Sequence, residues 1–288
     1  MRRMRPMLIL SIILTIFFCG ILLESLGQGV TTDDLSDLSY ILNSRYRPGT
    51  TYRSKIEAEM ILDLEMGKEA PVLRDKRIRI MAVTLASENG SLIVPFKLSF
   101  SDFQESSAGE LSDPELDIIM DTKIAGATGD IENGHLVIKN ICGIEPRYLD
   151  DMQDVLKPVF ELAYLHFPKK AMKLGDSFQN RFGVDYPVGG FGTVETTQDM
   201  TITLTSIDNN IAKLNVETIV NGTFIFEGVA FPVTGSGTIL LTLDIENQYF
   251  TSVEKNHTDI ISFVSGGSVI TIRSTEIYNN KTVIALNN

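Results

Sequence analysis

The fifteen residues from Tyr52 to Met66 alternate between apolar and charged or polar side chains almost without interruption. Successive side chains of a β-strand point to opposite faces, whereas a helix would spread the same charges around its whole circumference. The segment therefore predicts a strand with one core face and one solvated face, which is typical of antiparallel sheets.

The same two-residue period recurs along most of the chain and predicts an all-β fold. In the first part the expected strands cover residues 78–86, 92–100, 116–125 and 135–142. In the second part they cover residues 178–186, 193–206, 211–220, 223–231, 237–244, 249–256, 260–264 and 268–278. Gly and Asn punctuate these runs, so turns are expected at Asn89-Gly90, Asn209-Asn210, Gly235-Ser236-Gly237 and Ser265-Gly266-Gly267-Ser268.

The chain also repeats itself. Gly49-Thr50-Thr51-Tyr52 and Gly175-Asp176-Ser177-Phe178 open two similar stretches, and each stretch later contains Asp-Ile-Glu-Asn, at 130–133 and at 244–247. The offset falls from 175−49=126 to 244−130=114, which indicates extra loop residues in the first copy, placed at 101–115. Both Asp-Ile-Glu-Asn sequences are interpreted as turns between strands.

These patterns predict two duplicated antiparallel sheet units, at residues 45–142 and 174–288. Residues 28–44 form a linker, and residues 143–173 form a helical bridge, with a helix at 148–165 indicated by apolar residues three and four apart. Three arrangements of the units remain open, namely a two-sheet sandwich, a half-barrel and a barrel.

The N-terminus predicts export. Arg2, Arg3 and Arg5 precede an uncharged run of 23−7+1=17 residues, and Ser25 and Gly27 offer small residues before a cleavage at Gln28. A positive start, an apolar run and a small-residue exit are marks of a secretory signal, here residues 1–27. An uncleaved membrane anchor is the alternative, and either outcome places the protein in the periplasm, the cell envelope or the extracellular space.

The charge and composition of the chain disfavour some classes of binding partner. Without residues 1–27, which hold three Arg and one Glu, 22 basic and 36 acidic side chains remain, a net charge of −14. An acidic chain does not suit nucleic acid, which attracts clustered Lys and Arg. One cysteine, Cys142, remains in the mature chain, so no internal disulfide is expected, and it is interpreted as a strand-end residue.

The sequence contains no residue that we predict to be catalytic, cofactor-binding or metal-binding. His135, His166 and His257 have no metal-ligand spacing and are interpreted as ordinary surface histidines. The Ser-Gly stretches lack the Gly-x-Ser-x-Gly context of a serine nucleophile. We therefore expect a non-enzymatic protein that binds a protein partner or an apolar ligand such as lipid. The alternative is a hydrolase that uses dispersed Asp and Glu carboxylates.

Three stretches carry a resemblance to a known family: Arg45 to Tyr52, Phe167 to Phe178, and Gly235 to Ile245. Together they resemble uncharacterised bacterial exported proteins, many of them lipoproteins, with a Pro-x-Lys-x-Val-x-x-Gly-Asp-x-Trp motif. Met172 and Phe178 stand at the Val and Trp positions, and Phe18 before Cys19 departs from a lipobox. The resemblance implies an exported β-rich protein and transfers no site residue, because the family has no established activity.

Overall fold

In the computed structural model the described residues form one antiparallel sheet of eleven strands. The structure describes residues 39–44, 47, 49–67, 72–87, 94–109, 126–132, 135–142, 165, 167–188, 192–226, 228–265 and 267–285. The strands are β1 (Thr51–Met66), β2 (Leu73–Ser87), β3 (Val94–Gly109), β4 (Gly126–Glu132), β5 (His135–Cys142), β6 (Ser177–Val188), β7 (Gly192–Asp208), β8 (Ile211–Phe226), β9 (Val229–Asp244), β10 (Tyr249–Ser265) and β11 (Ser268–Ala285).

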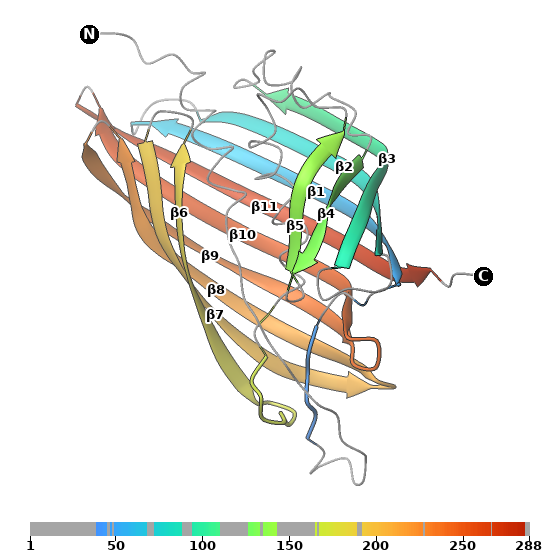
Figure 1. Ribbon diagram of the computed structural model, residues 1–288. Helices are drawn as coiled ribbons and strands as arrows, with labels where there is room; N and C mark the ends of the chain where they lie inside the picture. The colour runs from blue at the N-terminus through green and yellow to red at the C-terminus, as the bar shows by residue number, and fades with distance from the viewer. Residues whose placement is uncertain are drawn as a thin grey trace.

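The sheet is open and curved (Figure 1). Its order is β5-β4-β3-β2-β1-β11-β10-β9-β8-β7-β6, so β5 and β6 form its two edges. Nearly all contacts between the described strands run between sheet neighbours, so these strands make a single layer. The all-β prediction is confirmed, and of the three open arrangements the curved, unclosed sheet is the one observed.

The two halves of the chain join where the first strand meets the last. β1 pairs with β11 over sixteen positions, from Thr51 opposite Ala285 to Met66 opposite Ile270. Strands β1 to β5 come from the predicted first unit, and β6 to β11 come from the predicted second unit. Duplication of the two units stays a prediction.

Several expected boundaries were wrong. Residues 101–109, predicted as loop, continue β3, and Asp130 and Glu132 lie within β4. Asn221 and Gly222 do not end a strand, because β8 runs through to Phe226, and Gly235-Ser236-Gly237 lies inside β9. β10 is one strand of 17 residues, not two. The predicted strand 116–125, the Asn89-Gly90 turn and all of the predicted helix 148–165 except Leu165 lie outside the described residues.

Other turns are confirmed. Asn209 and Asn210 both have positive φ, at 48° and 64°, as a two-residue hairpin turn requires. Gly49 and Gly175, which open the two repeats, also have positive φ, at 72° and 85°. Such angles favour glycine, which has no Cβ to clash with the backbone. The two repeats therefore enter their first strands, β1 and β6, through a turn with the same glycine conformation.

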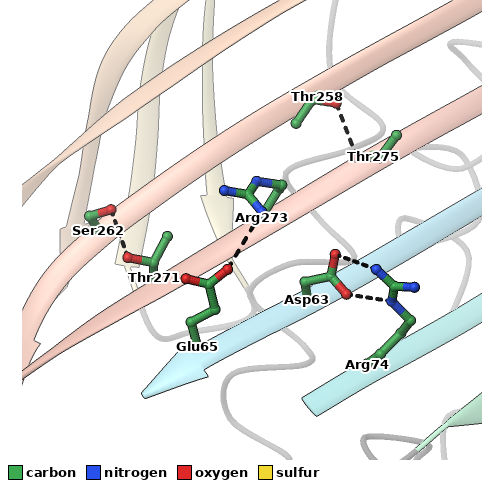
Figure 2. Close-up of polar contacts among 8 residues, drawn as sticks. All are labelled: Asp63, Glu65, Arg74, Thr258, Ser262, Thr271, Arg273 and Thr275. Carbon is green, nitrogen blue, oxygen red and sulfur yellow. Dashed lines mark hydrogen bonds and ion pairs between the residues drawn. The ribbon is translucent and has the colours of Figure 1, made fainter. Parts of the chain in front are cut away.

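The sheet has two unlike faces. Nearly all of its buried apolar side chains share one side, which we call the buried face; they are Tyr52, Ile56, Leu62, Leu64, Leu85, Met200, Ile202, Leu204, Ala212, Leu214, Val216, Phe224, Val233, Ile239, Leu241, Leu243, Phe250, Val253, Ile261, Ile272 and Tyr278. The other side, the solvent face, carries ion pairs and hydroxyl pairs between neighbouring strands. Figure 2 shows Asp63 with Arg74, Glu65 with Arg273, Thr258 with Thr275 and Ser262 with Thr271.

Two segments outside the strands cover one end of the buried face. Tyr40 pairs with Met172 through two backbone hydrogen bonds of 2.8 Å, and Leu42, Leu165, Phe167 and Met172 are buried. The ring of Phe167 lies 5.8 Å from that of Phe178 in β6 and 6.4 Å from that of Phe250 in β10. This cover therefore reaches the end of the sheet where β6 begins.

Candidate functional site

The buried face is the main apolar feature of the described strands, and its buried apolar side chains are at most 5% exposed. Its longest strand, β11, has 18 residues, which corresponds to about 60 Å of extended chain. At the end away from the cover, three aromatic rings from neighbouring strands meet. The ring of Phe231 lies 6.3 Å from that of Phe224 and 5.2 Å from that of Phe263. Apolar side chains thus lie at both ends of the central strands.

A group of polar side chains interrupts this apolar surface near its middle. We call it the polar cluster; its members are Thr218, Lys255, His257, Asp259, Ser274 and Glu276. His257 is 5% exposed and joins two partners. Thr218 Oγ1 lies 3.0 Å from His257 Nδ1, and His257 Nε2 lies 3.0 Å from Asp259 Oδ1. Because a carboxylate only accepts, Nε2–H donates to Asp259, and the second hydrogen bond joins Nδ1 to the Thr218 hydroxyl.

Two glycines in β9 make the cluster possible. His257 in β10 reaches Thr218 in β8 by crossing over Gly237, the residue opposite both in the ladders. A Cβ on Gly237 would lie 2.6 Å from His257 Nδ1, and a Cβ on Gly235 would lie 1.8 Å from Asp259 Oδ1. Any side chain at these positions would displace the imidazole or the carboxylate. The β9 glycines therefore serve the polar cluster and not a turn.

The cluster continues across β10 and β11. Lys255 and Glu276 form an ion pair of 2.5 Å, and each side chain is 17% exposed. Ser274 lies directly opposite Asp259 in the ladder, is 3% exposed, and its Oγ has no hydrogen-bond partner in the part of the chain that the structure describes. A buried hydroxyl without a partner costs about 1–3 kcal/mol, so this oxygen is a candidate to meet a ligand.

Thr218, His257 and Asp259 have the order of hydroxyl, imidazole and carboxylate found in catalytic triads. Two observations disfavour that chemistry. Thr218 is only 2% exposed, and it lies in an interior strand paired with β7 and β9. The backbone N–H groups beside it belong to those ladders, so the described strands offer no free pair of donors for an oxyanion. We therefore interpret the three residues as a hydrogen-bonded polar group held on an apolar face.

The histidines and carboxylates considered from the sequence do not gather at one place in the structure. His135 lies at the start of β5, and His166 falls outside the described residues. The interpretation of His257 as a surface histidine was wrong. Asp244 ends β9 and caps the following turn, accepting hydrogen bonds from the Asn247 backbone N–H at 2.8 Å and from Nδ2 at 2.9 Å. The turn interpretation of the second Asp-Ile-Glu-Asn is thereby confirmed.

The sequence carries a signal for the polar cluster that the expected strand boundaries left out. Odd-numbered residues of β10 face the core, from Val253 to Ile261, yet Lys255, His257 and Asp259 occupy three of these positions. Polar residues in core positions together with two glycines in the neighbouring strand indicate a buried polar network.

Among the described residues, no group of three His, Cys, Asp or Glu side chains is placed to hold a metal ion. In the same part of the chain, no helix has the length and apolar character needed to cross a bilayer.

A scan against sequence profiles of known protein families and a search of curated proteins both found no match. Solved structures similar to this chain include lipovitellin, described for its lipid–protein interactions, with a TM-score of 0.47, 14% identity and 84% of this chain covered. The match spans only 26% of the lipovitellin chain. Another is OccK7 (OpdD) of Pseudomonas aeruginosa, with a TM-score of 0.20, 9% identity, and 83% of this chain and 100% of that chain covered.

Proposed function

We propose that this protein is exported and binds an apolar ligand of the lipid class on the buried face of its sheet. The observation that carries the proposal is the long apolar face of the described strands, which holds a buried hydroxyl without a described partner, Ser274 Oγ. A single-layer sheet must bury its apolar side against something. On this face, the aromatic rings of Phe224, Phe231 and Phe263 meet at the end away from Phe167.

Export rests on the N-terminal sequence. The arginines and the 17-residue uncharged run that follows them are typical of a secretory signal or an anchor. A protein outside the cytoplasm would meet lipids of the envelope or of the medium. A protein partner on the same face is the alternative occupant.

The polar cluster supports a specific orientation for such a ligand. Ser274 Oγ is a buried donor and acceptor without a described partner, and it lies opposite the carboxylate of Asp259. Lys255 is already paired with Glu276, so no lysine or arginine of the polar cluster is left to pair with an anionic head group beside Asp259. The cluster therefore suits an uncharged hydroxyl group, as in a monoacylglycerol or a long-chain alcohol, with the acyl chain along the apolar strands.

Native mass spectrometry of the protein purified from its own host tests the proposal. We expect a co-purifying mass that organic extraction identifies as a lipid. The delipidated protein should then bind 1-oleoylglycerol and oleyl alcohol more tightly than oleate. A clean apo mass, together with no binding of any of the three probes, would contradict lipid binding.

The Asp259→Asn variant tests the orientation separately. It keeps a side chain of the same shape that accepts from His257, and it removes the charge that disfavours an anionic head group. We expect the preference for oleyl alcohol over oleate to shrink or reverse. An unchanged preference would place the ligand's polar end away from the polar cluster, even if the lipid itself is confirmed.

A further inference from the structure

Three neighbouring hairpins end in exposed aliphatic side chains at one end of the sheet. The hairpins are β1–β2, β10–β11 and β8–β9, and their six strands are consecutive in the sheet order. We call this end the apolar rim. Its exposed side chains are Met66 at 39%, Val72 at 49%, Val229 at 54%, Val264 at 67% and Val269 at 55%.

The ladders place these tips beside one another. Val264 pairs with Val269 across the β10–β11 hairpin, and Phe226 pairs with Val229 across the β8–β9 hairpin. The Gly67 backbone N–H donates to the Val269 carbonyl at 2.8 Å, which ties the β1 tip to the β11 tip. In Figure 1 the β10–β11 hairpin lies at the upper left, across the sheet from the C-terminus.

The opposite end of the sheet is built differently. There the β7–β8 tip is Asp208-Asn209-Asn210, and the β9–β10 tip is Asp244-Ile245-Glu246-Asn247-Gln248. These are ordinary polar turns. At the apolar rim, the described residues 225–226, 228–230, 264–265 and 267–270 include no charged residue, and the charged residues Lys68, Glu69 and Glu227 lie outside the described part. Five of the nine exposed large hydrophobic side chains in the described chain belong to this rim.

We propose that the apolar rim docks the protein on a lipid bilayer by inserting its hairpin tips into the interfacial region. Short aliphatic side chains on a line of tips can enter the boundary between head groups and acyl chains, and binding then scales with the buried apolar area. The chain carries a net charge of −12, which opposes adsorption to anionic lipid. The bilayer that suits the apolar rim is therefore one of zwitterionic lipid. Because the contact is apolar, high salt should not release the protein from it.

Vesicle flotation with phosphatidylcholine tests this with two matched triple variants. The rim variant is Val229→Ser, Val264→Ser and Val269→Ser. The control variant is Ile219→Ser, Leu240→Ser and Val283→Ser, whose side chains are equally exposed, at 55%, 53% and 58%, but lie in strands away from the three rim tips. Both variants keep the same N-terminal segment, so its contribution to binding is common to both.

We expect the rim variant to lose roughly tenfold or more in partitioning, since three apolar contacts are removed. The control should match the wild type, and both variants should retain oleyl alcohol binding in solution, which separates this result from the proposed function. Equal losses in the two variants, or no loss in the rim variant, would overturn the proposal. So would sedimentation showing that the rim variant only converts a dimer to a monomer, which would make the rim a contact between copies.

Discussion

The two faces of the sheet use polar residues in opposite ways. On the solvent face, Arg181 in β6 and Asp199 in β7 pair at 3.1 Å with side chains 73% and 46% exposed. On the buried face, His257 is 5% exposed and both of its ring nitrogens are engaged, at 3.0 Å each. Water can replace a lost partner on the first face but not on the second. A polar contact should therefore contribute little to the free energy of unfolding on the solvent face and more on the buried face.

The largest effect should come from filling the space above a β9 glycine. Gly235→Ala places a Cβ 1.8 Å from Asp259 Oδ1, so the carboxylate must move or the strands must separate. Overpacking of this kind costs about 1–3 kcal/mol, measured as the free energy of unfolding in urea.

Gly183→Ala in β6 is the matched control. A Cβ there meets nothing within 4 Å, so we expect a change close to zero or a small gain. Equal destabilisation of the two variants would show that the cost lies in the strand backbone and not in the polar cluster.

The next effect compares two threonines. Thr218→Val removes the hydroxyl partner of His257 Nδ1 and leaves a buried nitrogen unpaired, at a cost of about 1–3 kcal/mol in unfolding free energy. Thr258→Val on the solvent face removes only a half-buried hydroxyl pair with Thr275, at 3.0 Å. It should cost well under half as much. A larger loss for Thr258→Val would contradict the assigned difference between the faces.

A third comparison uses salt. Double-mutant cycles on Lys255–Glu276 and on Arg181–Asp199, whose side chains are 73% and 46% exposed, give the coupling free energy of each ion pair. Raising the ionic strength from 0.1 M to 1 M shortens the screening length from about 10 Å to about 3 Å. The solvent-face coupling should fall, whereas the Lys255–Glu276 coupling, with both side chains 17% exposed, should change little. An equal salt dependence of the two coupling free energies would contradict the assigned difference between the two faces.

The smallest effect concerns Tyr249, whose ring packs edge-on to that of buried Tyr52 at 5.7 Å. Burial, with a smaller contribution from the Asp244 carboxylate, raises the pKa of the Tyr249 phenol above its usual value of about 10. The neutral phenol is favoured in the folded state. Its stabilising contribution is therefore fully present below pH ~10 and is lost as pH rises through the folded pKa.

The difference in absorbance at 295 nm between wild type and Tyr249→Phe reports ionisation of this phenol. Its midpoint should lie above pH ~10. A midpoint at or below pH ~10 would show that this ring is not shielded in the folded protein.

Local patterning predicted the strands and their buried sides, because alternation reports which face a residue occupies. It failed where the polar cluster lies. The expected strands stopped at Asn256 and resumed at Ile260, leaving out His257 and Asp259, and Gly235 and Gly237 were taken for a turn. In these places the residues serve contacts across strands, which a local pattern does not record. The pairing of β1 with β11 was also unpredictable, since alternation does not specify a partner strand.

The central claim, that the buried face binds an apolar ligand, can be tested with an introduced fluorophore because the chain contains no Trp. Phe231→Trp places the indole among Phe224 and Phe263 on the buried face, and Leu240→Trp places it on the solvent face. Titration with a long-chain alcohol brominated along its chain should quench Phe231→Trp at saturation and leave Leu240→Trp nearly unchanged. Equal quenching of both variants, or quenching of neither, would contradict the account.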